Sequence, residues 1–209
     1  MLNILAVRNI TPIVSGFVLT VALVGCNVGV DTGQLKGQSN GQSASESSGQ
    51  SLPTVTAATV GNTKPLLQVE HCYLAGQPQA DDFVAFKAAG VKKVISIRDP
   101  SEVNWDERAA VEAAGMEFVQ IPMRSPDQMT EDKIKEICEL LQQADEQDEM
   151  VVLHCGAAVR ASAVWLAHYC VSRKASWEEA EAVAATLVEV PDAWKAPVKS
   201  YVEKNVSRN

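Results

Sequence analysis

The chain has 209 residues, and its 26 Asp and Glu against 18 Lys and Arg give a formal net charge of −8 at pH 7. An acidic chain without a basic cluster is not typical of proteins that bind nucleic acid or dock on anionic lipid. None of the five cysteines forms a Cys-x-x-Cys pair, so we expect no zinc site, no other metal site and no cofactor.

The first 25 residues have the layout of a secretory signal peptide. One basic residue, Arg8, precedes an apolar run from Ile10 to Val24, and no acidic residue occurs before Asp31. The run ends in LVGC, which resembles the lipobox of bacterial lipoproteins. The resemblance implies cleavage before Cys26 and lipidation of its thiol, which would anchor the protein to a membrane. An uncleaved transmembrane helix is the alternative.

The residue after the cysteine, Asn27, favours the outer membrane by analogy with enteric sorting, with the protein facing the periplasm. Residues 26–52 are then the lipidated cysteine and a tether of Gly, Ser and Gln, which has almost nothing to bury. Residues 53–209 are long enough for one domain with its own core.

In this domain, strand patterns alternate with helix patterns. We expect strands at 69–75, 92–98, 116–122 and 150–155. We expect helices that begin after Pro78, at Asn104, at Thr130, near Val159 and at Ser176, with capping boxes Asn104–Glu107 and Ser176–Glu179. The alternation predicts an α/β fold with a largely parallel central sheet flanked by helices. Sites in such sheets form beyond the carboxyl ends of the strands, where Cys155 lies.

The stretch LHCGAAVRASAVWL, residues 153–166, brings nucleophile, anion cradle and cation together. At a helix start, the N–H groups of Gly156, Ala157, Ala158 and Val159 lack intrahelical partners and can bind a tetrahedral anion. The same field favours the thiolate of Cys155, which is the nucleophilic form. Arg160 supplies a planar fork that grips two oxygens at once. The alternative is that Cys155 is a buried structural residue.

Three segments, YLAGQPQADDFVAFKAAGVKKVISIRDPSE, FVQIP and VVLHCGAAVRASAVWL, resemble the small tyrosine-phosphatase-like domain of the beta-lactamase-hydrolase-associated type. These domains are relatives of the dual-specificity phosphatases. The resemblance implies a cysteine-phosphatase-like fold, attack by Cys155 on a phosphomonoester, a cysteinyl-phosphate intermediate and stabilisation by Arg160. It also places Asp127, in the loop RSPDQMT, where the family has its general acid. A plain turn residue after Pro126 is the alternative.

The loop departs from the family pattern at three positions. GAAV places four residues between cysteine and arginine, one fewer than the usual phosphatase loop, and Ala158 stands where the family usually has Gly. Ala161 replaces the usual Ser or Thr after the arginine, and Ser162 comes one residue late.

Two alternative functions stay open. One is a rhodanese-like sulfurtransferase that carries a persulfide on Cys155 and takes a sulfur-containing substrate, and the other is an inactive anion-binding module. For the thiol itself, we expect mild oxidation to join Cys155 to Cys72 in a reversible disulfide.

Overall fold

A computed structural model describes residues 53–206 of the protein. The predicted signal peptide, Cys26 and the predicted tether lie outside these residues. Within residues 53–206, no helix is both long enough and apolar enough to cross a lipid bilayer.

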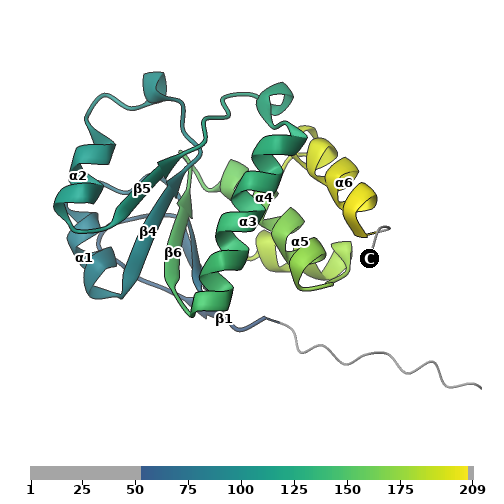
Figure 1. The fold of residues 1–209 in the computed structure, drawn as a ribbon, viewed down its shortest axis with the longest axis horizontal. Coiled ribbons are helices and arrows are strands. Elements are labelled where there is room, and N and C mark those ends of the chain that lie inside the picture. Colours follow the sequence, from purple (N-terminus) through teal and green to yellow (C-terminus); the bar gives the residue numbers. More distant parts are fainter. Residues whose placement is uncertain (1–52, 207–209) are drawn as a thin grey trace, which may run out of the picture. The chain divides into compact units, whose positions relative to one another are not determined.

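Six strands form one sheet in the order β1-β2-β3-β6-β4-β5 (Figure 1). The strands are β1 (Val55–Ala57), β2 (Leu66–Val69), β3 (Cys72–Ala75), β4 (Val91–Ser96), β5 (Glu117–Gln120) and β6 (Met150–His154). Strands β3, β6, β4 and β5 run parallel, whereas β1 and β2 extend the sheet as an antiparallel edge. The predicted α/β fold with a largely parallel sheet is therefore confirmed.

Helices cover both faces of the sheet (Figure 1). One face carries α1 (Asp82–Ala88) and α2 (Glu107–Ala113), and the other carries α3 (Glu131–Gln147), α4 (Val159–Ser172), α5 (Trp177–Ala185) and α6 (Asp192–Val206). Two short 3-10 helices, η1 (Pro100–Glu102) and η2 (Pro126–Gln128), lie in the connections after β4 and β5. Because both faces are covered, strand β6 is apolar up to its last residue, His154: Val152 packs toward α1 and α2, and Val151 and Leu153 pack toward the opposite core.

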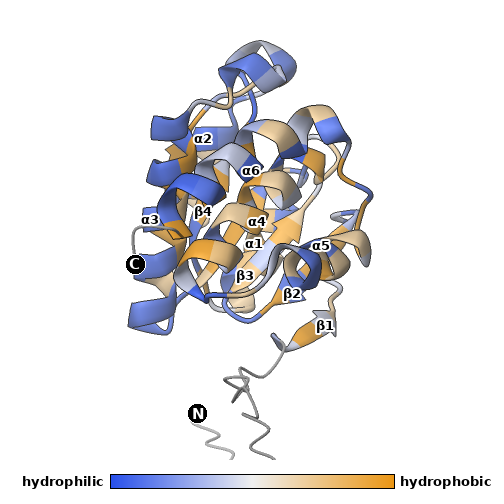
Figure 2. Ribbon diagram, turned by 90° about the vertical axis from the view of Figure 1, so that its right-hand side faces the viewer, coloured by the Kyte–Doolittle hydropathy of each residue, from blue (hydrophilic) through white to orange (hydrophobic). Residues whose placement is uncertain are grey.

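Helix α4 is the central helix of the larger layer. It packs against α3, α5 and α6, and every residue from Arg160 to Cys170 is buried. In Figure 2 it is coloured mostly hydrophobic, whereas α3 shows hydrophilic residues on its outer side. This burial holds the first turn of α4, and with it Arg160, firmly against the end of the sheet.

The predicted strand 69–75 is two strands rather than one. The chain reverses at Glu70, whose φ of 50° is in the left-handed region, and β2 and β3 then pair antiparallel. The polar pair Glu70–His71 interrupts the apolar pattern at this turn. Val69 and Cys72, on either side of Glu70–His71, are apolar, so the sequence pattern alone is that of one continuous strand.

The predicted capping box Asn104–Glu107 is wrong, and that of Ser176–Glu179 is confirmed. Helix α2 is capped by Asp106, whose side chain accepts from the Ala109 N–H at 2.9 Å. Glu107 is then the first helical residue, and its carboxylate is buried instead of capping the helix. Helix α6 was not predicted at all, because Pro197 interrupts its helical pattern.

Candidate active site

Cys155 directly follows β6, the strand that lies between β3 and β4. Its N–H donates to the Ala75 carbonyl at 3.3 Å, and the Gly156 carbonyl accepts from the Gln77 N–H at 3.1 Å. On the other side, the His154 carbonyl accepts from the Ile97 N–H at 2.9 Å. The loop is thus held between the extensions of two neighbouring strands, at the edge where parallel α/β sheets place their sites.

The turn of the loop places an alanine in a conformation that favours glycine. Ala158 has φ 63° and ψ −12°, and helix α4 begins at the next residue. A left-handed conformation costs a residue with a Cβ atom roughly 1–2 kcal/mol. Gly156 does not take over this role, since its φ is not among the positive ones. Ala158 therefore adopts the left-handed conformation at the position where the family usually has glycine. Ala158 is fully buried, and the residues packed around it hold it in this conformation.

The loop is open beside Gly156. A Cβ atom built on Gly156 would have only the Arg160 Nη2 within 4 Å, at 3.8 Å. The N–H groups of the first turn of α4 have no intrahelical acceptors, and they carry the positive end of the helix dipole. The arrangement is that of an anion cradle with a guanidinium at its side.

Arg160 is held by a carboxylate that sequence reasoning did not single out. Glu102, the last residue of η1, accepts from Arg160 Nη1 at 2.8 Å and from Nη2 at 3.0 Å. The Met123 carbonyl accepts a further bond from Nη1 at 2.7 Å. Burial lowers the pKa of Arg160, but the hydrogen bonds that it donates to Glu102 and the nearby Cys155 sulfur raise this pKa by more. The guanidinium is thus a fixed, permanent charge beside the thiol.

Glu102 is itself fixed by a capping box. Its side chain accepts from the Asp99 N–H at 2.9 Å, while the Asp99 side chain accepts from the Ser101 N–H at 2.9 Å. Burial raises the pKa of Glu102, but its bonds with Arg160 lower it by more, so Glu102 stays ionised at neutral pH. The spacing of Asp99 and Glu102 was the sequence signal that could have found this residue.

Asp127 lies on η2. The same loop contains Met123, whose carbonyl accepts from Arg160. The Asp127 side chain is exposed, and no hydrogen bond or ion pair holds it within residues 53–206. The loop is anchored nearby, because Met123 and Met129 are both buried and the Met123 N–H donates to the Ile97 carbonyl at 3.0 Å. The structure therefore brings the loop of Asp127 to the site without joining its carboxylate to Cys155 or Arg160.

The hydroxyl that phosphatases usually have after the arginine is absent here. Ala161 is fully buried and has no hydroxyl to offer. Ser162 is also fully buried, and its Oγ makes no hydrogen bond within the described part of the chain.

A family model described as "Polymorphic toxin system, DSP-PTPase phosphatase" (Tc-R-P) matches residues 70–175. These are 106 of the 209 residues, and they include the strands around the loop, the loop itself and all of α4. The chain belongs to this phosphatase family.

A relative of known description supports the same placement. The chain is 32% identical over 102 residues to the "Beta-lactamase hydrolase-like protein" of Agrobacterium fabrum (strain C58), a match that covers 46% of this chain. The match covers 23% of that relative, so the chain spans less than a quarter of its length.

Two solved structures show the fold. The chain is similar to Tk-PTP in its active form, with a TM-score of 0.58 and 17% identity over 64% of this chain and 92% of that one. It is also similar to a putative phosphatase (DUF442) from Shewanella putrefaciens CN-32, with a TM-score of 0.57 and 21% identity over 69% and 95% of the two chains. The predicted cysteine-phosphatase-like fold is thus confirmed.

The expected disulfide between Cys155 and Cys72 is wrong. Cys72 pairs with Val151 across β3 and β6, four residues before Cys155. At about 3.3 Å per strand residue the two cysteines are about 13 Å apart along the sheet, whereas a disulfide requires Cα atoms within about 7 Å. Burial raises the pKa of the Cys72 thiol well above its usual range, with Asp145 adding to the effect. Cys72 therefore cannot capture an oxidised Cys155.

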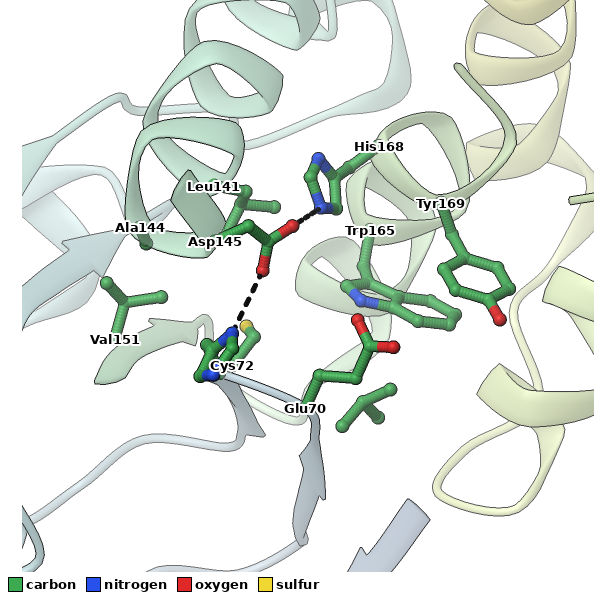
Figure 3. Close-up of a pocket in the computed structure, with 11 residues that line it drawn as sticks. Glu70, Cys72, Leu141, Ala144, Asp145, Val151, Trp165, His168 and Tyr169 are labelled. Atoms are coloured by element: carbon green, nitrogen blue, oxygen red, sulfur yellow. Dashed lines mark hydrogen bonds and ion pairs between the residues drawn. The ribbon is translucent and has the colours of Figure 1, made fainter. Parts of the chain in front are cut away.

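Cys72 belongs instead to a cluster at the opposite end of the sheet, which the sequence left as isolated residues (Figure 3). Asp145 of α3 contacts His168 Nε2 at 3.0 Å, His71 Nδ1 at 3.5 Å and Arg173 Nη2 at 3.3 Å. Burial raises the pKa of Asp145, but these partners, His168 first, lower it by more. The carboxylate ties α3 and α4 to the β2–β3 turn.

Asp145→Asn is expected to destabilise the folded protein by about 2 kcal/mol at pH 7, because it removes the shared charge of a partly buried network. The folded-state pKa of Asp145 lies below its unfolded value, so its contribution is full above about pH 4. That contribution is lost as the pH falls through the folded-state pKa. Urea unfolding at pH 7, 5 and 3 should show the gap between wild type and variant closing at the lowest pH.

The matched control is Asp148→Asn. The Asp148 side chain is 91% exposed and pairs with His71 at 2.8 Å, and the residue has a left-handed φ of 55° that asparagine also tolerates. Its variant should stay within about 0.5 kcal/mol of wild type. A gap for Asp145→Asn that is the same at all three pH values would contradict the assigned role of its charge.

Proposed function

We propose that the protein hydrolyses phosphomonoesters through a covalent phosphate on Cys155. One observation carries the proposal: the Arg160 guanidinium, locked by Glu102, lies beside the Cys155 sulfur at the N-terminus of a buried helix. This site offers a nucleophile, a fixed cation and backbone N–H groups to one tetrahedral anion. Membership of the phosphatase family supports the same reaction class.

The proposed reaction has two steps. The Cys155 thiolate attacks phosphorus, an S–P bond forms, and the P–O bond to the leaving group breaks. Arg160 and the N–H groups of residues 156–160 stabilise the charge on the transferring phosphoryl group. Water then attacks phosphorus, the S–P bond breaks, and inorganic phosphate and the thiolate are released.

Sulfur transfer is the second candidate, and the four-residue loop GAAV favours it. In that reaction the Cys155 thiolate would attack the outer sulfur of thiosulfate, the S–S bond of thiosulfate would break and sulfite would leave. Cyanide would then take the outer sulfur of the persulfide, which gives thiocyanate and restores the thiolate. The purified protein should therefore be assayed in parallel with an aryl phosphate and with thiosulfate plus cyanide. Release of phosphate without thiocyanate supports the proposal, and thiocyanate without phosphate overturns it. Binding of phosphate without either product would identify an inactive anion-binding module.

We propose Asp127 as the general acid that protonates the leaving oxygen. Its loop reaches the site through the bond between Met123 and Arg160, and its carboxylate is exposed to an incoming substrate. Asp127→Asn is expected to lower kcat by about 10²-fold for a substrate with a poor leaving group, such as phenyl phosphate. For a nitrophenyl phosphate, whose oxygen needs little protonation, the loss should be below about 10-fold.

The control for this variant is Asp132→Asn, an exposed residue in the first turn of α3. It should leave both substrates unaffected. Equal losses of kcat for the two leaving groups in Asp127→Asn would show that Asp127 is not the acid.

We also propose that the domain is held in the bacterial cell envelope by lipid on Cys26, facing the periplasm from the outer membrane. The LVGC sequence supports this, and it lies outside the described residues. Cys26→Ala is expected to abolish labelling with radioactive palmitate in growing cells and to leave the signal peptide uncleaved. Cys72→Ala, which removes a cysteine of the folded domain, should keep the label. Palmitate on the Cys26 variant would rule out the anchor.

A further inference from the structure

A group of polar side chains lies behind the Cys155 loop, and the reaction proposed above does not use it. Glu107 is 5% exposed and His154 is fully buried, which is unusual for residues of these types. Burial lowers the pKa of His154, and the Glu107 carboxylate only partly offsets this effect, so the imidazole is neutral at pH 7. A buried carboxylate beside a neutral imidazole is costly unless other hydrogen bonds satisfy it.

Neutral donors satisfy Glu107. Its Oε2 accepts from Ser96 Oγ at 2.9 Å, and its Oε1 accepts a short hydrogen bond from Gln77 Nε2. Oε1 also lies 3.4 Å from His154 Nε2. Three separate segments, the Gly-Gln-Pro turn after β3, the end of β4 and the start of α2, thus meet on one carboxylate.

Gln77 continues the path toward the guanidinium of the site. Its Oε1 accepts from Arg98 Nη1 at 2.7 Å, and Arg98 Nη2 in turn donates to the Glu102 carbonyl. The Glu102 carboxylate then holds Arg160 in the two-bond grip described above. Hydrogen bonds therefore run without a break from Glu107 through Gln77, Arg98 and Glu102 to Arg160.

Gln77 also contacts the loop directly, because its N–H donates to the Gly156 carbonyl. Among residues 53–206, only Gln77 forms hydrogen bonds with all three of the loop backbone, the buried Glu107 carboxylate and the Arg98 guanidinium. Its side chain is suited to this place because an amide both donates and accepts. The donor faces an anion and the acceptor faces a cation, so only one amide orientation fits.

We propose that Gln77 is a positioning residue for the reaction: its amide, between Glu107 and Arg98, sets the place of Arg160 relative to Cys155. This inference rests on the proposed phosphatase reaction. Gln77 does not touch the phosphate, and it acts on the transition state through Glu102 and Arg160. Loss of its amide removes the acceptor of Arg98 Nη1 and leaves only the bond from Nη2 to the Glu102 carbonyl, so η1 and its grip on Arg160 are less firmly aligned with the loop.

The first test is Gln77→Leu, which keeps the volume and the backbone N–H but removes both amide bonds. We expect kcat/KM for an aryl phosphate to fall about 10-fold, because a misaligned guanidinium holds both the bound phosphate group and the transition state less well. Gln120→Leu is the control. The Gln120 side chain donates to the backbone carbonyl of Arg98 at 3.2 Å and not to the guanidinium path, so kcat/KM of Gln120→Leu should stay at the wild-type value.

The second test exchanges the charge. Gln77→Glu places two carboxylates side by side and should lower kcat/KM at least as much as Gln77→Leu. Adding Glu107→Gln restores a donor opposite the new carboxylate, which still accepts from Arg98, and should recover most of the lost kcat/KM. A purely structural role in packing would not predict this rescue. Failure of the double variant to exceed Gln77→Glu would overturn the proposal.

The third test is a double-mutant cycle with Arg160→Lys. If Gln77 acts through Arg160, Gln77→Leu should cost less than about 2-fold in the Arg160→Lys background. An unchanged 10-fold loss in that background would overturn the proposal.

A separate readout distinguishes this inference from the proposed function. Inorganic phosphate should raise the Tm of the wild type, and Gln77→Leu should lose more than half of the shift while Gln120→Leu keeps it. If the wild type binds phosphate but hydrolyses no ester, the proposed reaction fails and this comparison alone decides the role of Gln77. A full shift in Gln77→Leu would then overturn that role, and no shift in the wild type would overturn both proposals.

Discussion

Cys155→Ser is expected to abolish hydrolysis of aryl phosphates, with kcat lowered by about 10⁴-fold or more. A serine hydroxyl at this position is neutral at pH 7, and the neighbouring imidazole of His154 cannot act as its base, since it lies behind the loop beside Glu107 and not at the open face. The anion cradle does not depend on the sulfur. Phosphate should therefore still raise the Tm of the variant, which separates lost chemistry from lost folding.

Quenched-flow experiments with a ³²P-labelled ester should trap acid-stable label on the wild type and none on Cys155→Ser. Cys170→Ser is the control, because Cys170 lies in the last turns of α4, away from the loop, and burial raises the pKa of its thiol to about 11. Cys138, with a pKa raised to about 12 by burial, should be equally inert. Iodoacetamide at neutral pH should accordingly modify Cys155 ahead of both. A Cys155→Ser variant that retains turnover would rule out the covalent intermediate.

Arg160→Lys is expected to lower kcat by about 10³-fold. Two nitrogens of the Arg160 guanidinium donate to Glu102. The other N–H groups in the same plane can at the same time point at a phosphate bound beside Gly156. A lysine ammonium is a single point charge and cannot hold both partners in one fixed plane. It would leave the Glu102 carboxylate partly unpaired in a site where that side chain is only 20% exposed.

The same variant should lose most of the Tm shift that phosphate gives the wild type. Arg108→Lys provides a matched control, since its guanidinium is half exposed on α2 and stacks on Phe118 at 4.9 Å. It should keep both turnover and the phosphate shift. An equal phosphate shift in Arg160→Lys and wild type would show that Arg160 is not the anion clamp.

Local patterns in the sequence were sufficient for the elements that carry the loop. The apolar run 150–155 predicted a buried strand, and the residues after it predicted a helix near Val159, where α4 begins. The box Ser176–Glu179 was found because both of its bonds are made within four residues. The prediction at Asn104 failed because Asp106, two residues on, offers an equally good cap, and the burial of Glu107 decides between them.

By itself, the sequence determined the α/β class, the strand-to-helix placement of Cys155 and the short distance from it to Arg160, because neighbouring residues share one local geometry. Only the tertiary structure decided what holds Arg160. Glu102 lies 58 residues away, Met123 lies 37 away, and both meet the guanidinium because β4, β5 and β6 end at the same edge of the sheet. The same parallel order places Cys72 at the far edge beside Asp145, out of reach of Cys155. Strand order depends on which apolar faces can be buried together, and no short stretch of the chain contains that information.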